Sequence, residues 1–224
     1  MTTINVLKKL SMATAGAAVM ALTTVGMNQA EASTIVLDFE GVGNLNPVGD
    51  FYNDDYGITF SPNTLGLVDS DAGGSGNFGG EPSGDTGAFF LGGGAAVMNV
   101  ANGFTDGFSF FYSSPFIPGF VNVYDGLNGT GNLLTSLSLP LTPRNGAPDP
   151  TGVFSPFLPF GASFSGVAKS VDFGGAANAI VFDNITLGSA TPVVVPEPAS
   201  LIGILGLGAF GVTTLRKRKS TVKS

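Results

Sequence analysis

Short segments in which apolar and polar residues alternate recur through the middle of the chain, separated by turn residues. They lie at residues 34–39, 56–60, 95–100, 108–112, 121–124, 137–139, 171–173, 179–182 and 185–187. A period of two places successive side chains on opposite faces of a strand, and no helical period accompanies it. The pattern therefore predicts an all-β domain over residues 33–190, folded as an antiparallel β-sandwich.

The chain begins with a different pattern. A basic pair precedes an apolar, Ala-rich run at residues 10–25. Ala30 and Ala32 then supply small side chains at the two positions where signal peptidase has small pockets. Residues 1–32 are thus predicted to be a signal peptide with a helical apolar core, and the mature chain would begin near Ser33. The alternative is an N-terminal anchor that is retained.

The end of the chain, residues 191–224, has three parts in a fixed order. The first is a proline-containing motif made of Val195, Pro196, Glu197 and Pro198. An uncharged run at residues 199–215 follows, near the lower limit of about 17 residues for a helix that spans a bilayer. The last part is a basic cluster made of Arg216, Lys217, Arg218 and Lys219. Because basic residues stay on the cytoplasmic side, a transmembrane helix here leaves the body outside.

This tail resembles the PEP-CTERM sorting signal, which has the same three parts in the same order. The resemblance implies recognition by exosortase, an integral-membrane cysteine transpeptidase that would remove the helix. The protein would then be a precursor tethered to the inner membrane before it reaches the cell surface or the extracellular matrix. The alternative is a plain tail anchor in which the prolines only interrupt the helix.

Composition narrows the possible functions of the body. Only 11% of the 224 residues are charged, and the 34 Gly and 14 Pro disfavour long helices. Between the two ends, Arg144 and Lys169 are the only basic residues, and the acidic surface that results argues against a nucleic-acid partner. The absence of Cys and His excludes disulfides, thiolate metal sites and every mechanism that depends on histidine.

Two segments at opposite ends of the body, residues 37–41 and 182–187, look like the first and last strands of jelly-roll carbohydrate-binding modules. In such modules these strands lie close together, and their carboxylates often hold a structural Ca²⁺. The resemblance therefore implies Glu40 and Asp183 as calcium ligands, and carboxylate oxygens suit calcium. The alternative is that both are strand-end carboxylates that face water. Because Trp is absent, a sugar platform would have to use Tyr52, Tyr56, Tyr112 or Tyr124.

Other motifs carry weaker signals. Residues 74–79 spell GxGxxG but open no helix, which dinucleotide binding requires. Residues 69–73 resemble the start of an EF-hand, but Gly80 stands where its twelfth-position Glu is needed, so only an irregular calcium turn stays open. Residues 85–87 match the aspartic-protease triplet without a second copy. No pair of carboxylates is marked by its spacing for glycoside hydrolysis, and we expect no enzyme.

These observations favour an exported protein with a structural or adhesive role in exopolysaccharide or biofilm. Its expected partners are signal peptidase, exosortase, the membrane and, in the matrix, exopolysaccharide. The alternative is a calcium-stabilised carbohydrate-binding module, which would recognise particular glycans.

Overall fold

The computed structural model describes residues 34–92, 96–144, 152–174 and 178–195. Eleven strands and one four-residue helix, α1 (Asn53–Tyr56), form the regular structure of these residues. Among these described residues, no helix is long and apolar enough to cross a bilayer. The predicted signal helix within residues 1–32 and the predicted transmembrane helix at residues 199–215 lie outside the described residues.

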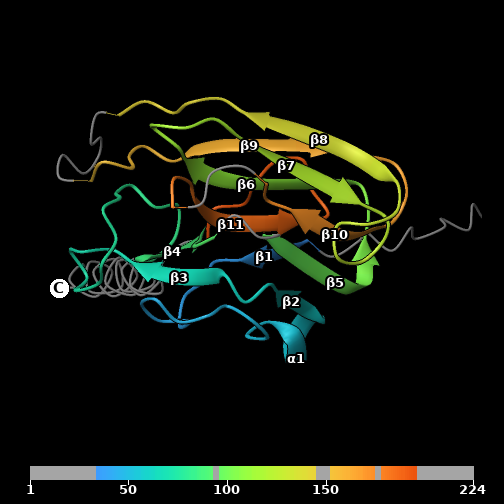
Figure 1. The fold of residues 1–224 in the computed structure, drawn as a ribbon, viewed down its shortest axis with the longest axis horizontal. Coiled ribbons are helices and arrows are strands. Elements are labelled where there is room, and N and C mark those ends of the chain that lie inside the picture. The colour runs from blue at the N-terminus through green and yellow to red at the C-terminus, as the bar shows by residue number, and fades with distance from the viewer. Residues whose placement is uncertain (1–33, 93–95, 145–151, 175–177, 196–224) are drawn as a thin grey trace, which may run out of the picture. The chain divides into compact units, whose positions relative to one another are not determined.

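The strands form two sheets in which every neighbouring pair is antiparallel (Figure 1). The first sheet has the order β3-β4-β11-β6-β9 with β1 beside β11, and comprises β1 (Ile35–Leu37), β3 (Thr64–Val68), β4 (Thr86–Phe90), β6 (Gly107–Ser113), β9 (Leu158–Ser163) and β11 (Val181–Leu187). The second has the order β2-β5-β10-β7-β8, and comprises β2 (Ile58–Phe60), β5 (Val97–Phe104), β7 (Gly119–Tyr124), β8 (Leu133–Leu139) and β10 (Ala168–Asp172). The predicted all-β, antiparallel fold is confirmed.

Phenylalanine rings join the two sheets. The ring of Phe182 on β11 lies 5.3 Å from that of Phe110 on β6 and 5.1 Å from that of Phe173, which directly follows β10. Phe90 at the end of β4 lies 5.9 Å from Phe182 and stacks on Phe173 at 5.3 Å. Edge-to-face and offset arrangements of this kind suit the charge distribution of aromatic rings. The many Phe residues therefore form the centre of a chain that has no Trp.

Three strands, β3, β4 and β9, were not predicted from the alternating pattern. All five residues of β4 are buried, so no polar face marks it in the sequence. Pro159 and Gly161 disfavour β9, and Gly66 interrupts β3. A second, smaller core made of Phe78, Phe157 and Val181 covers the outer side of β11 at Val181, and all seven residues of β11 are buried.

The first and last strands lie side by side. Leu37 of β1 is paired with Ile185 of β11, and Ile35 is paired with Leu187. The adjacency that the resemblance to jelly-roll modules implied is therefore present. It also means that the chain enters and leaves the sandwich at neighbouring positions.

The residues that follow β11 stay attached to the body. The amide of Gly188 donates to the carbonyl of Gly107 at 3.0 Å, and Ser109 Oγ donates to the carbonyl of Ser189 at 2.9 Å. The amide of Val193 donates to Thr186 Oγ1 at 3.2 Å. Contacts of the body thus continue three residues beyond the boundary predicted at residue 190.

Candidate functional site

The sorting tail begins where the described structure ends. Val195 is the last described residue, and only Val194 separates it from the attached residues 188–193. Outside the described residues lie the rest of the proline motif, the signal cleavage positions and the basic cluster, namely Pro196, Glu197, Pro198, Ala30, Ala32, Arg216, Lys217, Arg218 and Lys219. The roles of these positions stay predictions from the sequence.

The two carboxylates predicted from the terminal strands meet the same loop, residues 83–86, which leads into β4. Glu40 Oε1 accepts hydrogen bonds from the backbone amides of Asp85 at 3.0 Å and Thr86 at 2.8 Å. Glu40 Oε2 accepts a third from Thr86 Oγ1 at 3.1 Å. Gly84 suits this position, because its φ of +41° is one that L side chains rarely adopt and a Cβ here would displace the Glu40 carboxyl group.

Asp183 approaches the same loop at Ser83 and is completely buried. Its Oδ1 accepts a hydrogen bond from the amide of Asn184 at 2.6 Å, and Ser83 Oγ lies 3.4 Å from both of its oxygens. The same hydroxyl lies only 2.6 Å from Asn184 Oδ1, and it has one proton to donate. Asp183 therefore does not face water, and the loop leaves it poorly supplied with hydrogen-bond donors.

The buried carboxylate lies among other negative charges. Burial raises the pKa of Asp183 well above its usual range, and the carboxylates of Glu40 and Asp38 raise it further. Burial also raises the pKa of Glu40, despite its hydrogen bonds to Thr86 and Asp85. In a folded protein, proton uptake or a bound cation relieves this kind of repulsion.

The side-chain atoms near Glu40 and Asp183 are of the type that binds calcium. Glu40, Asp183, Ser83 and Thr86 offer only oxygen atoms, which a hard cation prefers. Within the described ranges, no three His, Cys, Asp or Glu side chains lie close enough to hold a metal ion, so the carboxylates here number two. Glu40 and Asp183 are the residues that would hold the ion, and calcium binding remains a prediction.

The tyrosines proposed as sugar platforms divide into two groups. Tyr52 and Tyr112 are buried, at 6% and 1% exposure. Tyr52 Oη accepts a hydrogen bond from the amide of Phe39 at 2.7 Å, and Tyr112 Oη donates to the carbonyl of Pro140 at 3.0 Å. Neither ring can stack on a sugar, and for these two the expectation is wrong. Tyr56 is exposed and Tyr124 is half-buried.

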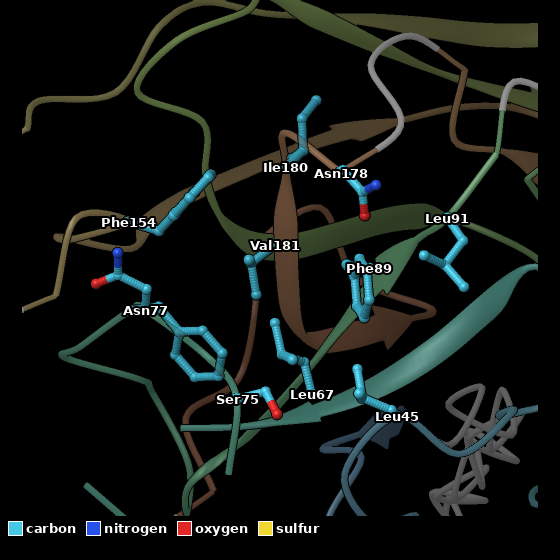
Figure 2. Close-up of a pocket in the computed structure, with 11 residues that line it drawn as sticks. Leu45, Leu67, Ser75, Asn77, Phe89, Leu91, Phe154, Asn178, Ile180 and Val181 are labelled. Carbon is cyan, nitrogen blue, oxygen red and sulfur yellow. The ribbon is translucent and has the colours of Figure 1, made fainter. Parts of the chain in front are cut away.

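A groove that the sequence did not indicate lies on the outer side of the first sheet (Figure 2). Its volume is about 360 Å³, and its lining is mainly apolar. The lining residues are Leu45, Leu67, Ser75, Asn77, Phe78, Phe89, Leu91, Phe154, Asn178, Ile180 and Val181. Figure 2 shows Phe154 and Asn77 on one side and Leu45 and Leu91 on the other, with Leu67, Phe89 and Val181 between them.

A few amide and hydroxyl groups border the groove, and no charged side chain belongs to its described lining. Asn77 Oδ1 accepts from the amide of Val153 at 3.1 Å, and Ser75 Oγ accepts from Asn44 Nδ2 at 2.9 Å. The backbone amide of Asn178 donates to the carbonyl of Phe90 at 2.8 Å, whereas its side-chain amide makes no hydrogen bond to another described side chain. Small-molecule sites commonly combine an apolar lining with a few polar groups, and this groove would suit an uncharged ligand.

Three solved structures are similar to the chain at low sequence identity. The K2 cleaved adhesin domain of Lys-gingipain has a TM-score of 0.45 and 9% sequence identity, and the match covers 69% of this chain and 99% of that one. The C-terminal CBM6 module of the marine laminarinase LamC from Zobellia galactanivorans has a TM-score of 0.31 and 14% identity, with 56% of this chain and 98% of that one covered. A carbohydrate-binding module of Cellvibrio mixtus lichenase 5A has a TM-score of 0.31 and 13% identity, with 61% of this chain and 92% of that one covered. No curated protein sequence matches the chain.

The tail matches a known family of sorting motifs. Residues 194–219 match the PEP-CTERM protein-sorting motif, and they include the proline motif, the uncharged run and the basic cluster. This match confirms the resemblance on which the sorting prediction rests. The chain carries a PEP-CTERM sorting motif, which indicates an exported surface protein that exosortase processes.

Proposed function

We propose that the body of this protein is a structural or adhesive component of the exopolysaccharide matrix, delivered there through its PEP-CTERM tail. The motif at residues 194–219 is the observation that carries the proposal. The body suits the role, because it is a sandwich with few charges and no described cluster of catalytic side chains. It serves as a building element of the matrix and catalyses no reaction there.

The way in which the tail leaves the body supports this route. Among the described residues, the last hydrogen bond along the chain is that of Val193, three residues before Pro196. Three extended residues span at most about 10 Å. The processing motif therefore follows the folded domain within a few residues of sequence, and the domain would be delivered as a unit once the tail is cut.

The sorting step is tested by changing the tail and locating the body. Glu197→Ala should leave unprocessed precursor in the membrane fraction, and deletion of residues 201–219 should release soluble protein into the periplasm. Cell fractionation with an antibody against the body measures both outcomes. Glu81→Ala, a carboxylate change within the body, serves as the control and should be sorted normally. Unchanged surface delivery after both tail changes would refute the sorting assignment.

The groove on the first sheet favours a second candidate function, the binding of an uncharged glycan. Sugars present C–H groups that pack on apolar and aromatic surfaces and hydroxyls that pair with amides. Phe154 and Leu91 supply the first kind of contact and Asn178 supplies the second. In this reading the calcium predicted at Glu40 and Asp183 stabilises the fold and takes no part in sugar contact.

A glycan array with residues 33–195 distinguishes the two functions. We expect selective binding of neutral over acidic glycans if the groove is a sugar site, and Asn178→Ala should weaken it at least tenfold. Asn53→Ala, which changes an exposed amide on α1, should leave binding unchanged. The absence of any selective signal would eliminate the second function and leave the sorting proposal intact.

A further inference from the structure

The sandwich has four sheet edges, and three of them are protected. Along the outer side of β3, Leu45 and Val48 donate backbone hydrogen bonds to β3, and Asn46 accepts one from Gly66. Along β2, Phe60 donates to the carbonyl of Gly49, and Ile58 donates to that of Tyr52. These neighbouring segments occupy the backbone groups that an edge strand otherwise leaves open.

The third edge, β9, contains Pro159. A proline has no N–H to offer to an added strand, and this is one of the ways in which proteins prevent pairing at an edge. The short strand β1 pairs with β11 and offers only three residues.

The fourth edge, β8, has none of these features. It is a seven-residue strand that pairs with β7 on one side only, and it runs along the rim of the molecule in Figure 1. No backbone hydrogen bond joins its other side to a described residue. It contains no proline, and the irregularity in its pairing with β7 lies near its start, between Leu133 and Thr135, so that residues 135–139 are regularly paired. Ser136 and Ser138 are exposed on this regular part. Such an edge is a template for another strand.

Charge indicates what that strand belongs to. Residues 126–143 contain no charged side chain, whereas the rest of the body carries scattered acids and only two basic residues. Two copies of an acidic body repel each other over most of their surface, and β8 is a long edge at which they can meet without like charges in contact. A strongly basic partner would gain nothing from this neutral strand.

We propose that β8 pairs with β8 of a second copy of the protein, antiparallel and around a two-fold axis near Ser136. A two-fold contact uses the same surface on both copies, which a neutral, self-complementary edge allows. Leu137 and Leu139, which face the core, would extend the apolar interior across the joint. The two five-stranded sheets then form one continuous sheet, and this gives a surface protein a way to link copies of itself.

Engineered cysteines test the contact in the full chain on cells, because the natural chain has no Cys. Residues opposite each other in an antiparallel pair have Cα atoms about 4.5–5.5 Å apart, within reach of a disulfide. Ser136→Cys and Ser138→Cys, expressed singly and together, cover the three registers centred on residues 136, 137 and 138. With a mild oxidant, at least one of them should give a dimer on a non-reducing gel. Ser165→Cys, exposed in the turn after β9, is the control and should stay monomeric.

A second variant separates pairing from random collision. Ser138→Lys in the background of Ser136→Cys adds one lysine from each copy to the joint, on the same face as the cysteines, and should reduce the dimer at least fivefold. Dimer formation equal to that of Ser165→Cys, no dimer from any β8 cysteine, or crosslinking to a protein of another size would overturn the proposal. Sorting is measured by fractionation of the same cells, so a sorting failure is distinguished from a failure to pair.

Discussion

The side chain of Asp183 shows how a single residue can make the stability of this fold depend on pH. It is a fully buried carboxylate, and its burial, together with the negative charges of Glu40 and Asp38, raises its pKa well above the usual 3.8. Between the usual value and the raised value, the folded protein holds a proton that the unfolded chain has released. Ionising Asp183 in the folded protein therefore lowers the free energy of unfolding.

The sign of this linkage gives a prediction. In chelator, the contribution of Asp183 to the stability of residues 33–195 should be greatest below about pH 4, near the usual carboxyl pKa, and should fall as pH rises towards the raised pKa. One linked proton corresponds to a slope of about 1.4 kcal/mol per pH unit within that window. Urea melts across a pH series should show this slope in the natural sequence and a flatter profile in Asp183→Asn. Identical pH profiles for the two proteins would mean that Asp183 is not the linked group.

The neighbouring residue, Phe182, tests the aromatic core. Its ring contacts Phe90, Phe110 and Phe173 and is 1% exposed. Phe182→Ala leaves a cavity between the sheets and should destabilise the domain by about 3–5 kcal/mol in denaturant melts. Phe116→Ala, at a position that is 47% exposed, should cost much less. Equal losses for both variants would remove Phe182 from the central role that its contacts indicate.

At the scale of elements, the pairing of β1 with β11 brings the two ends of the body together. The loop at residues 83–86 lies against both, because it binds Glu40 through backbone amides and approaches Asp183 through Ser83. A cation bound there would join three segments that are distant in the sequence. Its effect should therefore appear in global unfolding and not in local fraying alone.

Calcium should raise the melting temperature of residues 33–195 above that in chelator. Ligand linkage gives about 2.7 kcal/mol at a concentration a hundredfold above the dissociation constant. Magnesium should stabilise less, because it keeps its water and demands strict octahedral geometry. Glu40→Gln should abolish the difference between the two ions, while Glu81→Gln should preserve it. Superimposable thermal melts in chelator, magnesium and calcium would reduce Glu40 and Asp183 to carboxylates without a metal.

At the scale of the whole molecule, the described body is held together by its own contacts, and the predicted sorting signals lie outside it. The described body closes through β1, β11 and the attached residues 188–193, and none of these contacts involves the signal peptide or the uncharged run. In the proposed route, the sorting signals act while the chain is exported, and the sandwich is the part that would remain after their removal.

The body should therefore fold without either end. Far-ultraviolet circular dichroism of residues 33–195 should show β-structure with very little helix, since α1 is four residues long. A fragment ending at residue 187 lacks the hydrogen bonds of Gly188, Ser189 and Val193 and should melt at a lower temperature. A helical or random-coil spectrum for the longer fragment would contradict the sandwich.

The sequence alone determined the features that are encoded locally. The alternation of apolar and polar residues marks strands such as β6 and β7, because a strand exposes successive side chains to opposite faces. The PEP-CTERM tail is a linear motif read by an enzyme, so its order of residues is sufficient to identify it. The pair Glu40 and Asp183 was found through the resemblance of two short segments.

Only the tertiary structure decided what depends on packing between distant segments. β4 has no polar face because both its sides are covered, and β9 forms despite Pro159 because it lies at an edge. The groove joins Leu45, Phe89, Phe154 and Val181 from separate elements. Burial of Asp183, the engaged hydroxyls of Tyr52 and Tyr112, and the open side of β8 follow from the same cause. A local pattern records which residues can form a strand, whereas burial and exposure depend on which other segments cover it.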